Sequence, residues 1–217
     1  IGRKSKEKII ATSRYIIILA TLLLLGCHKK QMQLPQVEDA KITSVEDYSQ
    51  VYISYEEPMG EAKLNANGLI SSTNWVLHVD KRNKLSKVAP LFIKLQEKRT
   101  NPRNPHSDPD AHLYCSLADM SHNRLGFMDV TNLTLLPYDP QKMSEYGNTP
   151  IYVYPDGFQL KEDKGEKTPW SEFGVYKNVL YVWVFSGEMT FQQFVDIYYT
   201  RLHQQTDVPI SKIMIND

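Results

Sequence analysis

Residues 181–202, YVWVFSGEMTFQQFVDIYYTRL, decide the fold of this chain. The stretch begins with five consecutive apolar or aromatic residues, which is typical of a strand that is covered on both faces. After a short turn, four residues have the i, i+3, i+4, i+7 spacing of a buried helix face: Phe191, Phe194, Val195 and Tyr198. Thr190 and Gln193 match the capping box at the start of a helix. We therefore predict a strand over 181–185 and a helix over 190–205.

The same pattern occurs 106 residues earlier, and the two stretches align without a gap. A strand is predicted over 75–79 and an amphipathic helix over 86–99. The apolar face of this helix aligns with the face described above and consists of Leu85, Val88, Ala89 and Phe92. Each helix is followed by another strand candidate, HLYCSL at 112–117 and ISKIMI at 210–215. Each stretch is therefore a strand–helix–strand unit whose two strands share a sheet.

The aligned units share almost no identical residues, apart from Val76 and Val182. A duplication and two independent units both explain the repeated pattern, and both predict a similar architecture. Between the units, strands are predicted over 125–130 and 133–138, and a hairpin over 151–160. The predicted fold class is therefore α+β, with two strand–helix–strand units around a mixed β-sheet and an intervening β-hairpin region.

The N-terminal region contains an apolar run, YIIILATLLLLGC at 15–27. This run is shorter than the roughly 20 apolar residues that a membrane-spanning helix needs. Five basic residues precede it: Arg3, Lys4, Lys6, Lys8 and Arg14. A basic region followed by a short apolar run is typical of a secretory signal peptide. The predicted segments are a signal peptide (1–26), a polar tether (27–43) and a globular domain (44–217, with possible halves 44–138 and 139–217).

The end of the apolar run, Leu-Leu-Gly-Cys at 24–27, resembles the lipobox of bacterial lipoproteins with a type II signal peptide. The resemblance implies cleavage before Cys27 and acyl chains on the amine and thiol of that residue. Each buried methylene contributes about 0.8 kcal/mol to membrane anchoring. The implied location is the bacterial cell envelope. His28, in place of Asp, favours the outer membrane by analogy with enteric sorting, with the domain facing the periplasm.

A second resemblance concerns residues 178–202, NVLYVWVFSGEMTFQQFVDIYYTRL. The order of their predicted elements is similar to that of the periplasmic domains of Exb/Tol-type energy-transducing proteins. This resemblance is one of topology and carries over no functional residue.

The charge of the chain argues against a nucleic-acid partner. The whole chain has 25 basic and 25 acidic residues, and residues 1–26 hold five of the basic and one of the acidic ones. The remaining 20 basic and 24 acidic residues give a formal charge of −4, whereas nucleic-acid binding needs a basic face. The sequence has no dinucleotide fingerprint, P-loop or nucleophile elbow, so we predict no cofactor.

One loop has the composition of a metal site: NPHSDPDAH at 104–112. Its candidate ligands lie within seven residues: His106, Asp108, Asp110 and His112. Imidazole and carboxylate groups together suit zinc or another divalent ion. A solvated crossover loop explains the same residues, because Asp, Asn, Ser and Pro are ordinary turn formers. Both interpretations stay open.

Two further groups could form sites. Aromatic candidates for binding a sugar or a peptide gather in the C-terminal half: Tyr152, Tyr154, Trp170 and Trp183. If they are buried, these residues belong to the core. Cys115 lies in an alternating apolar segment and is predicted to be a buried strand thiol. The alternative is a nucleophile with His112 or His122 as its base.

The function that these features favour is a non-catalytic binding or scaffolding module of a lipid-anchored envelope protein. Its partners would be the membrane, through Cys27, and another envelope protein, contacted through an exposed sheet edge or the aromatic cluster. An immunity-type lipoprotein that neutralises a toxin would have the same sequence features. The alternative from a different class is a metal-dependent hydrolase of an envelope substrate that uses the 104–112 loop.

Overall fold

The computed structural model describes residues 31–101, 108, 110–146, 149–160, 167–173, 181–202 and 210–216. The predicted signal peptide, Cys27 and His106 lie outside these residues. The domain described below extends from Met32 to Asp217. In the described part of the chain, no helix is both long enough and apolar enough to cross a membrane.

The first sheet is built on three parallel strands: β2 (Tyr48–Glu56), β4 (Asn74–Val79) and β5 (Leu113–Asp119). Two antiparallel strands extend it, β3 (Glu61–Asn65) beside β2 and β6 (Arg124–Asp129) beside β5. The helix α2 (Leu85–Arg99) connects β4 to β5. The first predicted strand–helix–strand unit is therefore confirmed, and its two strands are parallel neighbours.

The second sheet has four parallel strands: β7 (Thr134–Pro137), β8 (Thr149–Tyr154), β10 (Tyr181–Ser186) and β11 (Lys212–Asn216). The antiparallel strand β9 (Gly157–Leu160) forms the predicted hairpin with β8. After β10 the chain forms α4 (Phe191–Val195), which continues as a π-helix (Asp196–Leu202). The second predicted unit is confirmed, and the predicted end of its helix, 203–205, lies outside the described residues.

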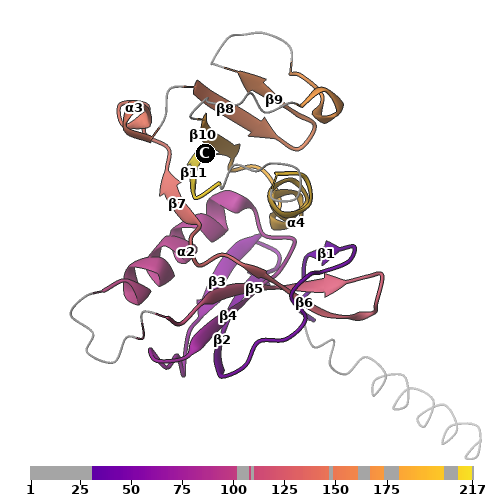
Figure 1. The fold of residues 1–217 in the computed structure, drawn as a ribbon, viewed down its shortest axis with the longest axis vertical. Coiled ribbons are helices and arrows are strands. Elements are labelled where there is room, and N and C mark those ends of the chain that lie inside the picture. Colours follow the sequence, from indigo (N-terminus) through magenta and orange to yellow (C-terminus); the bar gives the residue numbers. More distant parts are fainter. Residues whose placement is uncertain are drawn as a thin grey trace, which may run out of the picture. The chain divides into compact units, whose positions relative to one another are not determined.

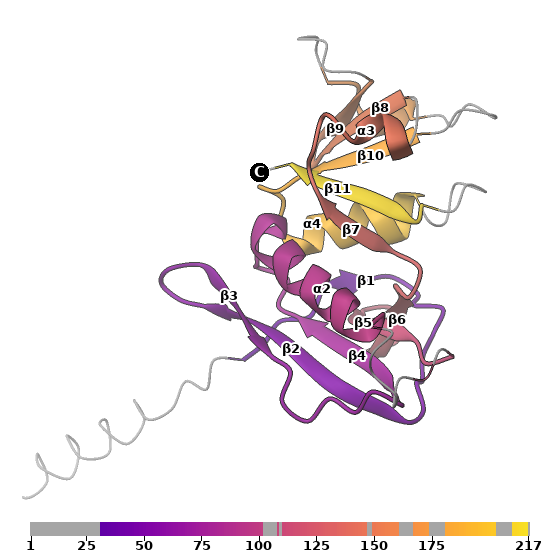
Figure 2. The same cartoon turned by 90° about the vertical axis from the view of Figure 1, so that its left-hand side faces the viewer.

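The two halves repeat one topology. The segments β2-β3-β4-α2-β5 and β8-β9-β10-α4-β11 have the same chain order, sheet order and strand directions. The predicted α+β class is confirmed, but with two mixed sheets in place of one, and α2 and α4 lie between them (Figure 1, Figure 2). The repeat includes the hairpins, which favours a duplication. Because β7 pairs with β11, the second half begins before Thr134 and not at residue 139 as predicted.

The starts of the two helices meet as if across a twofold axis. Their N-cap residues, Lys84 and Thr190, form an antiparallel bridge and lie 106 positions apart. The first pair of bonds is Leu85 N–H to the Met189 carbonyl and Phe191 N–H to the Asn83 carbonyl, both 2.7 Å. The next pair is Ser86 N–H to the Gly187 carbonyl (2.9 Å) and Gln192 N–H to the Lys81 carbonyl (3.1 Å). Each half thus satisfies N–H groups that have no acceptor within their own helix.

The two helices differ in their own caps. The predicted capping box of α4 is confirmed, because Gln193 N–H donates to Thr190 Oγ1 at 3.2 Å and Thr190 N–H donates to Gln193 Oε1 at 2.9 Å. No side chain caps α2 at Lys84. The α2 start therefore depends on the backbone of the second half, while α4 has its side-chain cap in addition.

The chain before β2 belongs to the folded domain. The short strand β1 (Gln36–Val37) pairs in parallel with the end of β5, and Ala40 is buried in the core. The side-chain amide of Gln192 binds both backbone groups of Gln36, at 2.8 and 2.9 Å. The folded part therefore begins earlier than Ser44, where the polar tether was predicted to end. Most residues of this segment are polar, so its few apolar residues did not indicate that it belongs to the folded domain.

Candidate functional site

The predicted metal loop contains no metal cluster among its described residues. The Asp110 N–H donates to Asp108 Oδ1 at 2.9 Å, which is a turn-forming contact. His112 Nδ1 lies 2.8 Å from Asp129 Oδ2 on β6. His106 lies outside the described residues, and nowhere in the described part of the chain do three His, Cys, Asp or Glu residues form a possible metal site. A metal at this loop stays a prediction.

The four predicted aromatic binding residues do not form one surface. Tyr152 and Trp183 are buried on opposite faces of the second sheet. Trp170 is partly buried against Phe158, with ring centroids 5.5 Å apart, and donates its indole N–H to the Tyr154 carbonyl at 3.2 Å. Tyr152 and Trp183 are core residues, which is the alternative that the sequence left open for buried side chains.

Cys115 is the buried strand thiol that the sequence predicts. Its side chain lies on the core side of β5, and burial raises the pKa of the thiol to about 12. A thiol with this pKa stays protonated at neutral pH and is a poor nucleophile. The proposed base His112 is instead paired with Asp129 and stacked on Tyr114.

The outer face of the second sheet is closed. Four buried residues form a second, smaller core on this face: Tyr152, Val182, Val184 and Met214. Tyr138 and Met143, the first residue of α3 (Met143–Tyr146), pack against them. This face therefore contributes to stability and offers little surface for a partner.

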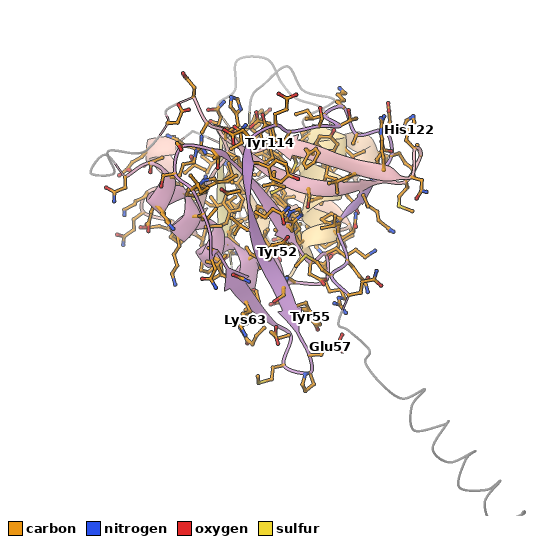
Figure 3. All side chains as sticks on the ribbon, turned by 90° about the horizontal axis from the view of Figure 1, so that it is seen from below. Tyr52, Tyr55, Glu57, Lys63, Tyr114 and His122 are labelled. Carbon is orange, nitrogen blue, oxygen red and sulfur yellow. The ribbon has the colours of Figure 1, made fainter. Side chains whose placement is uncertain are left out.

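The outer face of the first sheet is buried at its centre, at Val76, Ser116 and Phe127, and exposed toward its edges. The helices α2 and α4 lie on the other side of this sheet (Figure 2). Strand register places Tyr52 on β2 beside His78 on β4, and Tyr114 on β5 beside Asp129 on β6. Figure 3 views the domain from this side, with Tyr52 and Tyr114 labelled. Aromatic and imidazole side chains therefore gather on one sheet face.

Two tyrosine–imidazole stacks organise this face. The rings of Tyr52 and His78 are 4.8 Å apart with 22° between their planes, and those of His112 and Tyr114 are 5.7 Å apart with 15°. Nδ1 of His78 lies 2.8 Å from Ser116 Oγ, and Nδ1 of His112 lies 2.8 Å from Asp129 Oδ2. We name the surface the tyrosine–histidine face and define it by these residues: Tyr52, His78, His112, Tyr114, Ser116 and Asp129.

Burial determines the chemistry of His78. Desolvation lowers the pKa of its imidazole, so His78 is neutral at pH 7. Its Nε2 atom is buried and has no hydrogen-bond partner among the described residues. The Ser116 hydroxyl beside it is also buried, so this pair does not present an accessible nucleophile. The imidazole is better suited to orient Tyr52 and to accept a hydrogen bond.

Asp129 carries a negative charge at the opposite end of the face. Burial raises the pKa of Asp129, but hydrogen bonds from Thr131 and His112 outweigh that effect and hold it below its usual value. Asn74 links this end to Glu46 and Asp47, because it donates to their carbonyl groups and accepts a bond from the His112 N–H. Asp108 and Asp110 precede His112 in the chain, and the charge of Arg99 acts on Asp129 and Asp108. The tyrosine–histidine face therefore has an acidic rim.

Three large side chains of this face are exposed, two on β2 and one on β6. Tyr48 is 40% and Tyr52 is 37% exposed, and Leu125 on β6 is 41% exposed. Sequence reasoning missed these residues because their pattern is ordinary strand alternation. Only the pairing of β2, β4, β5 and β6 shows that they share a face.

Comparison of the chain with models of known protein families, with curated proteins and with solved structures finds no match. The function therefore has to be derived from the residues of this chain.

Proposed function

We propose that this chain is a lipid-anchored protein of a bacterial cell envelope whose domain binds another envelope protein and catalyses no reaction on it. The observation that carries the proposal is the tyrosine–histidine face, on which Tyr52 is exposed and Tyr114 is partly exposed. Tyrosine offers a large and rigid contact area with a polar end, and it is enriched at the centres of protein interfaces. On the corresponding face of the second sheet, Tyr138 and Met143 pack over the buried residues.

The acidic rim supports a protein as the partner. Glu46, Asp47 and Asp129 border the exposed tyrosines, and like charges repel nucleic acid and anionic headgroups. A protein surface with basic residues around an apolar centre would complement this arrangement. Such a partner would be steered to the face by charge and held by contact with Tyr52 and Tyr114.

The state of the reactive side chains also supports binding over catalysis. Cys115 is buried with a raised pKa, and Ser116 is buried beside the neutral His78. His112 is oriented by Asp129 and stacked on Tyr114. The position of each of these side chains is thus explained by its burial or by its contacts with neighbouring residues.

The proposed location in the cell envelope is inferred from the sequence at 15–27 and can be tested separately from the binding surface. We expect Cys27→Ser to move the protein from the membrane fraction to the soluble fraction, because the variant has no thiol to acylate. Immunoblotting after cell fractionation measures this change. Cys115→Ser is the matched control and is expected to stay with the membrane. If Cys27→Ser also stays there, the lipid anchor is not the reason for membrane association.

The binding surface is tested by photocrosslinking in intact cells. A benzoylphenylalanine at Tyr52 is expected to give one crosslinked product that mass spectrometry identifies as an envelope protein. Tyr114→Ala in the same chain should weaken binding about 30-fold, the effect of losing a central interface residue worth about 2 kcal/mol. The crosslinked product should decrease accordingly.

The matched control places the crosslinker at Leu160, an exposed position on β9 of the second sheet. No product is expected there. Equal products from Tyr52 and Leu160, or a product from Tyr52 that Tyr114→Ala leaves unchanged, would contradict the assignment of the tyrosine–histidine face.

A further inference from the structure

The chain enters the domain at one end of the first sheet. Gln33 N–H donates to Asp80 Oδ2 at 3.2 Å, and Lys81 N–H donates to the Gln33 carbonyl at 2.8 Å. Asp80 and Lys81 follow directly after β4. Because β2 and β4 are parallel, Gln33 is held at the carboxyl ends of both strands.

The linker between the proposed acylation site and this point is short. Gln33 is six positions after Cys27, and an extended chain spans at most about 3.6 Å per residue, so the two residues are no more than about 22 Å apart. The nine residues of β2 extend about 26 Å, since a strand rises about 3.3 Å per residue. An acyl anchor at Cys27 therefore keeps the carboxyl end of β2 near the bilayer, and the amino end of β2 lies a strand length away.

The β2–β3 hairpin presents an apolar side chain at this same end. Arg82 connects the hairpin to the start of the domain, because it pairs with both Asp80 and Glu57 at 2.8 Å. Glu57, Pro58 and Met59 are consecutive exposed residues at the turn of the hairpin. Met59 is 78% exposed, more than any other large hydrophobic residue that the structure describes.

We propose that the turn of the β2–β3 hairpin rests on the bilayer to which Cys27 is anchored, with the Met59 side chain among the lipid headgroups. The inference rests on the proposed lipid anchor and does not depend on the tyrosine–histidine face. One apolar side chain binds a bilayer weakly by itself, but the short linker holds it there at a high effective concentration. In this orientation the amino ends of β2 and β4 point away from the bilayer. Figure 3 shows Glu57 toward the end of the hairpin and Tyr114 at the opposite end of the sheet.

The charges at the two ends of the first sheet agree with this orientation. Three ion pairs at the hairpin end each join a carboxylate to a basic side chain: Arg82–Glu57, Lys87–Glu61 and Lys84–Glu188, at 2.8, 2.9 and 2.6 Å. The opposite end has the acidic rim, which anionic headgroups repel. The end held near the bilayer by the linker is thus also the end that a negatively charged surface repels less.

The test uses the full acylated protein in vesicles of phosphatidylethanolamine and phosphatidylglycerol. Met59→Cys is labelled with the fluorophore NBD, and nitroxides near the headgroup end of the acyl chains quench a label that enters the bilayer. Cys27 is acylated in this protein and Cys115 is buried, so only the introduced thiol is labelled. Ile70→Cys is the matched control, because Ile70 is 57% exposed and its N–H donates to Ser49 near the amino end of β2.

The label at position 59 is expected to lose about half of its fluorescence or more, because an apolar group at the interface lies about 5–10 Å deep, close to the nitroxides. The label at position 70 should lose almost none. Inserting about twelve Gly/Ser residues after Lys30 lengthens the linker and lowers the effective concentration of the hairpin at the surface. This insertion should reduce the quenching at position 59.

Flotation of the same vesicles separates this proposal from the lipid anchor. Protein that floats with its vesicles but shows equal quenching at positions 59 and 70 would overturn the orientation and leave the anchor in place. Quenching at position 59 that the longer linker leaves unchanged would overturn the role of the linker in orienting the domain. Protein that does not float with the vesicles has no anchor and would overturn both proposals.

Discussion

Phe194→Ala is expected to lower the free energy of unfolding by about 3–5 kcal/mol, the usual cost of removing a buried aromatic ring. Phe194 is buried in the core at the start of α4. Its ring centroid lies 5.5 Å from Phe185, 5.6 Å from Phe191 and 5.4 Å from Tyr198. Truncation leaves a cavity bordered by three aromatic rings, and rings of this size cannot move far enough to fill it. Urea denaturation followed by tryptophan fluorescence measures the loss.

The matched control is Val88→Ala, because Val88 occupies the corresponding position in α2 and is fully buried. Truncating it removes two methyl groups and is expected to cost about 2 kcal/mol. A loss at Phe194 no larger than the loss at Val88 would mean that the core of the second half is not organised around this ring.

Asp80→Ala is expected to destabilise the domain by about 2–4 kcal/mol, because it removes one partner of a largely buried ion pair. The Asp80 side chain is 2% exposed. It accepts bonds from Arg82 Nε (2.9 Å), Arg82 Nη2 (2.8 Å), Arg82 N–H (3.1 Å) and Gln33 N–H (3.2 Å). Arg82 also pairs with Glu57 at 2.8 Å and lies over the Tyr55 ring, so it keeps some of its contacts in the variant.

The cost of Asp80→Ala is also expected to depend on pH. Burial raises the pKa of Asp80, but the hydrogen bonds and charge of Arg82 outweigh burial and hold the pKa below its ordinary value of 3.8. A carboxyl group with a lowered pKa stabilises the fold above the unfolded-state pKa, and this contribution is lost as the pH falls below it. The difference between wild type and variant should therefore be constant near neutral pH and shrink below about pH 4.

Ser186→Ala is the matched control, because Ser186 lies 106 residues after Asp80 at the end of β10. Its hydroxyl accepts one bond, from Glu188 N–H at 3.4 Å, so the expected loss is about 0.5–1 kcal/mol. Equal losses at the two positions, or a loss at Asp80 that does not change with pH, would contradict the role assigned to the ion pair.

The local elements could be predicted from the sequence because their signals are local. The apolar spacing of 190–202, the capping box at Thr190 and the hairpin at 151–160 depend on neighbouring residues. The division into two sheets could not be predicted, because it depends on which strands pair across long stretches of chain. The two-residue strand β1 was missed for the same reason, since its partner lies more than 80 residues away.

The candidate face needed the fold before it could be recognised. Alternation along each strand places Tyr52, His78 and Tyr114 on some face, but only the order of the strands shows that the face is common to them. The aromatic binding site predicted from the sequence instead combined residues that are close along the chain. That criterion combined Tyr152 and Trp183, which lie on opposite faces of one sheet, and it missed Asp129 as the partner of His112.

The reciprocal bonds between the helix starts have a consequence for how the domain folds. Neither half can complete its own helix, because backbone N–H groups of α2 need carbonyls of the second half and those of α4 need carbonyls of the first. A chain cut between β6 and β7 would yield two fragments that each expose an incomplete helix start and an uncovered core. We expect such fragments to be ordered only in each other's presence, and the intact domain to unfold in a single cooperative transition. Two similar halves thus form one folding unit and not two small domains in tandem.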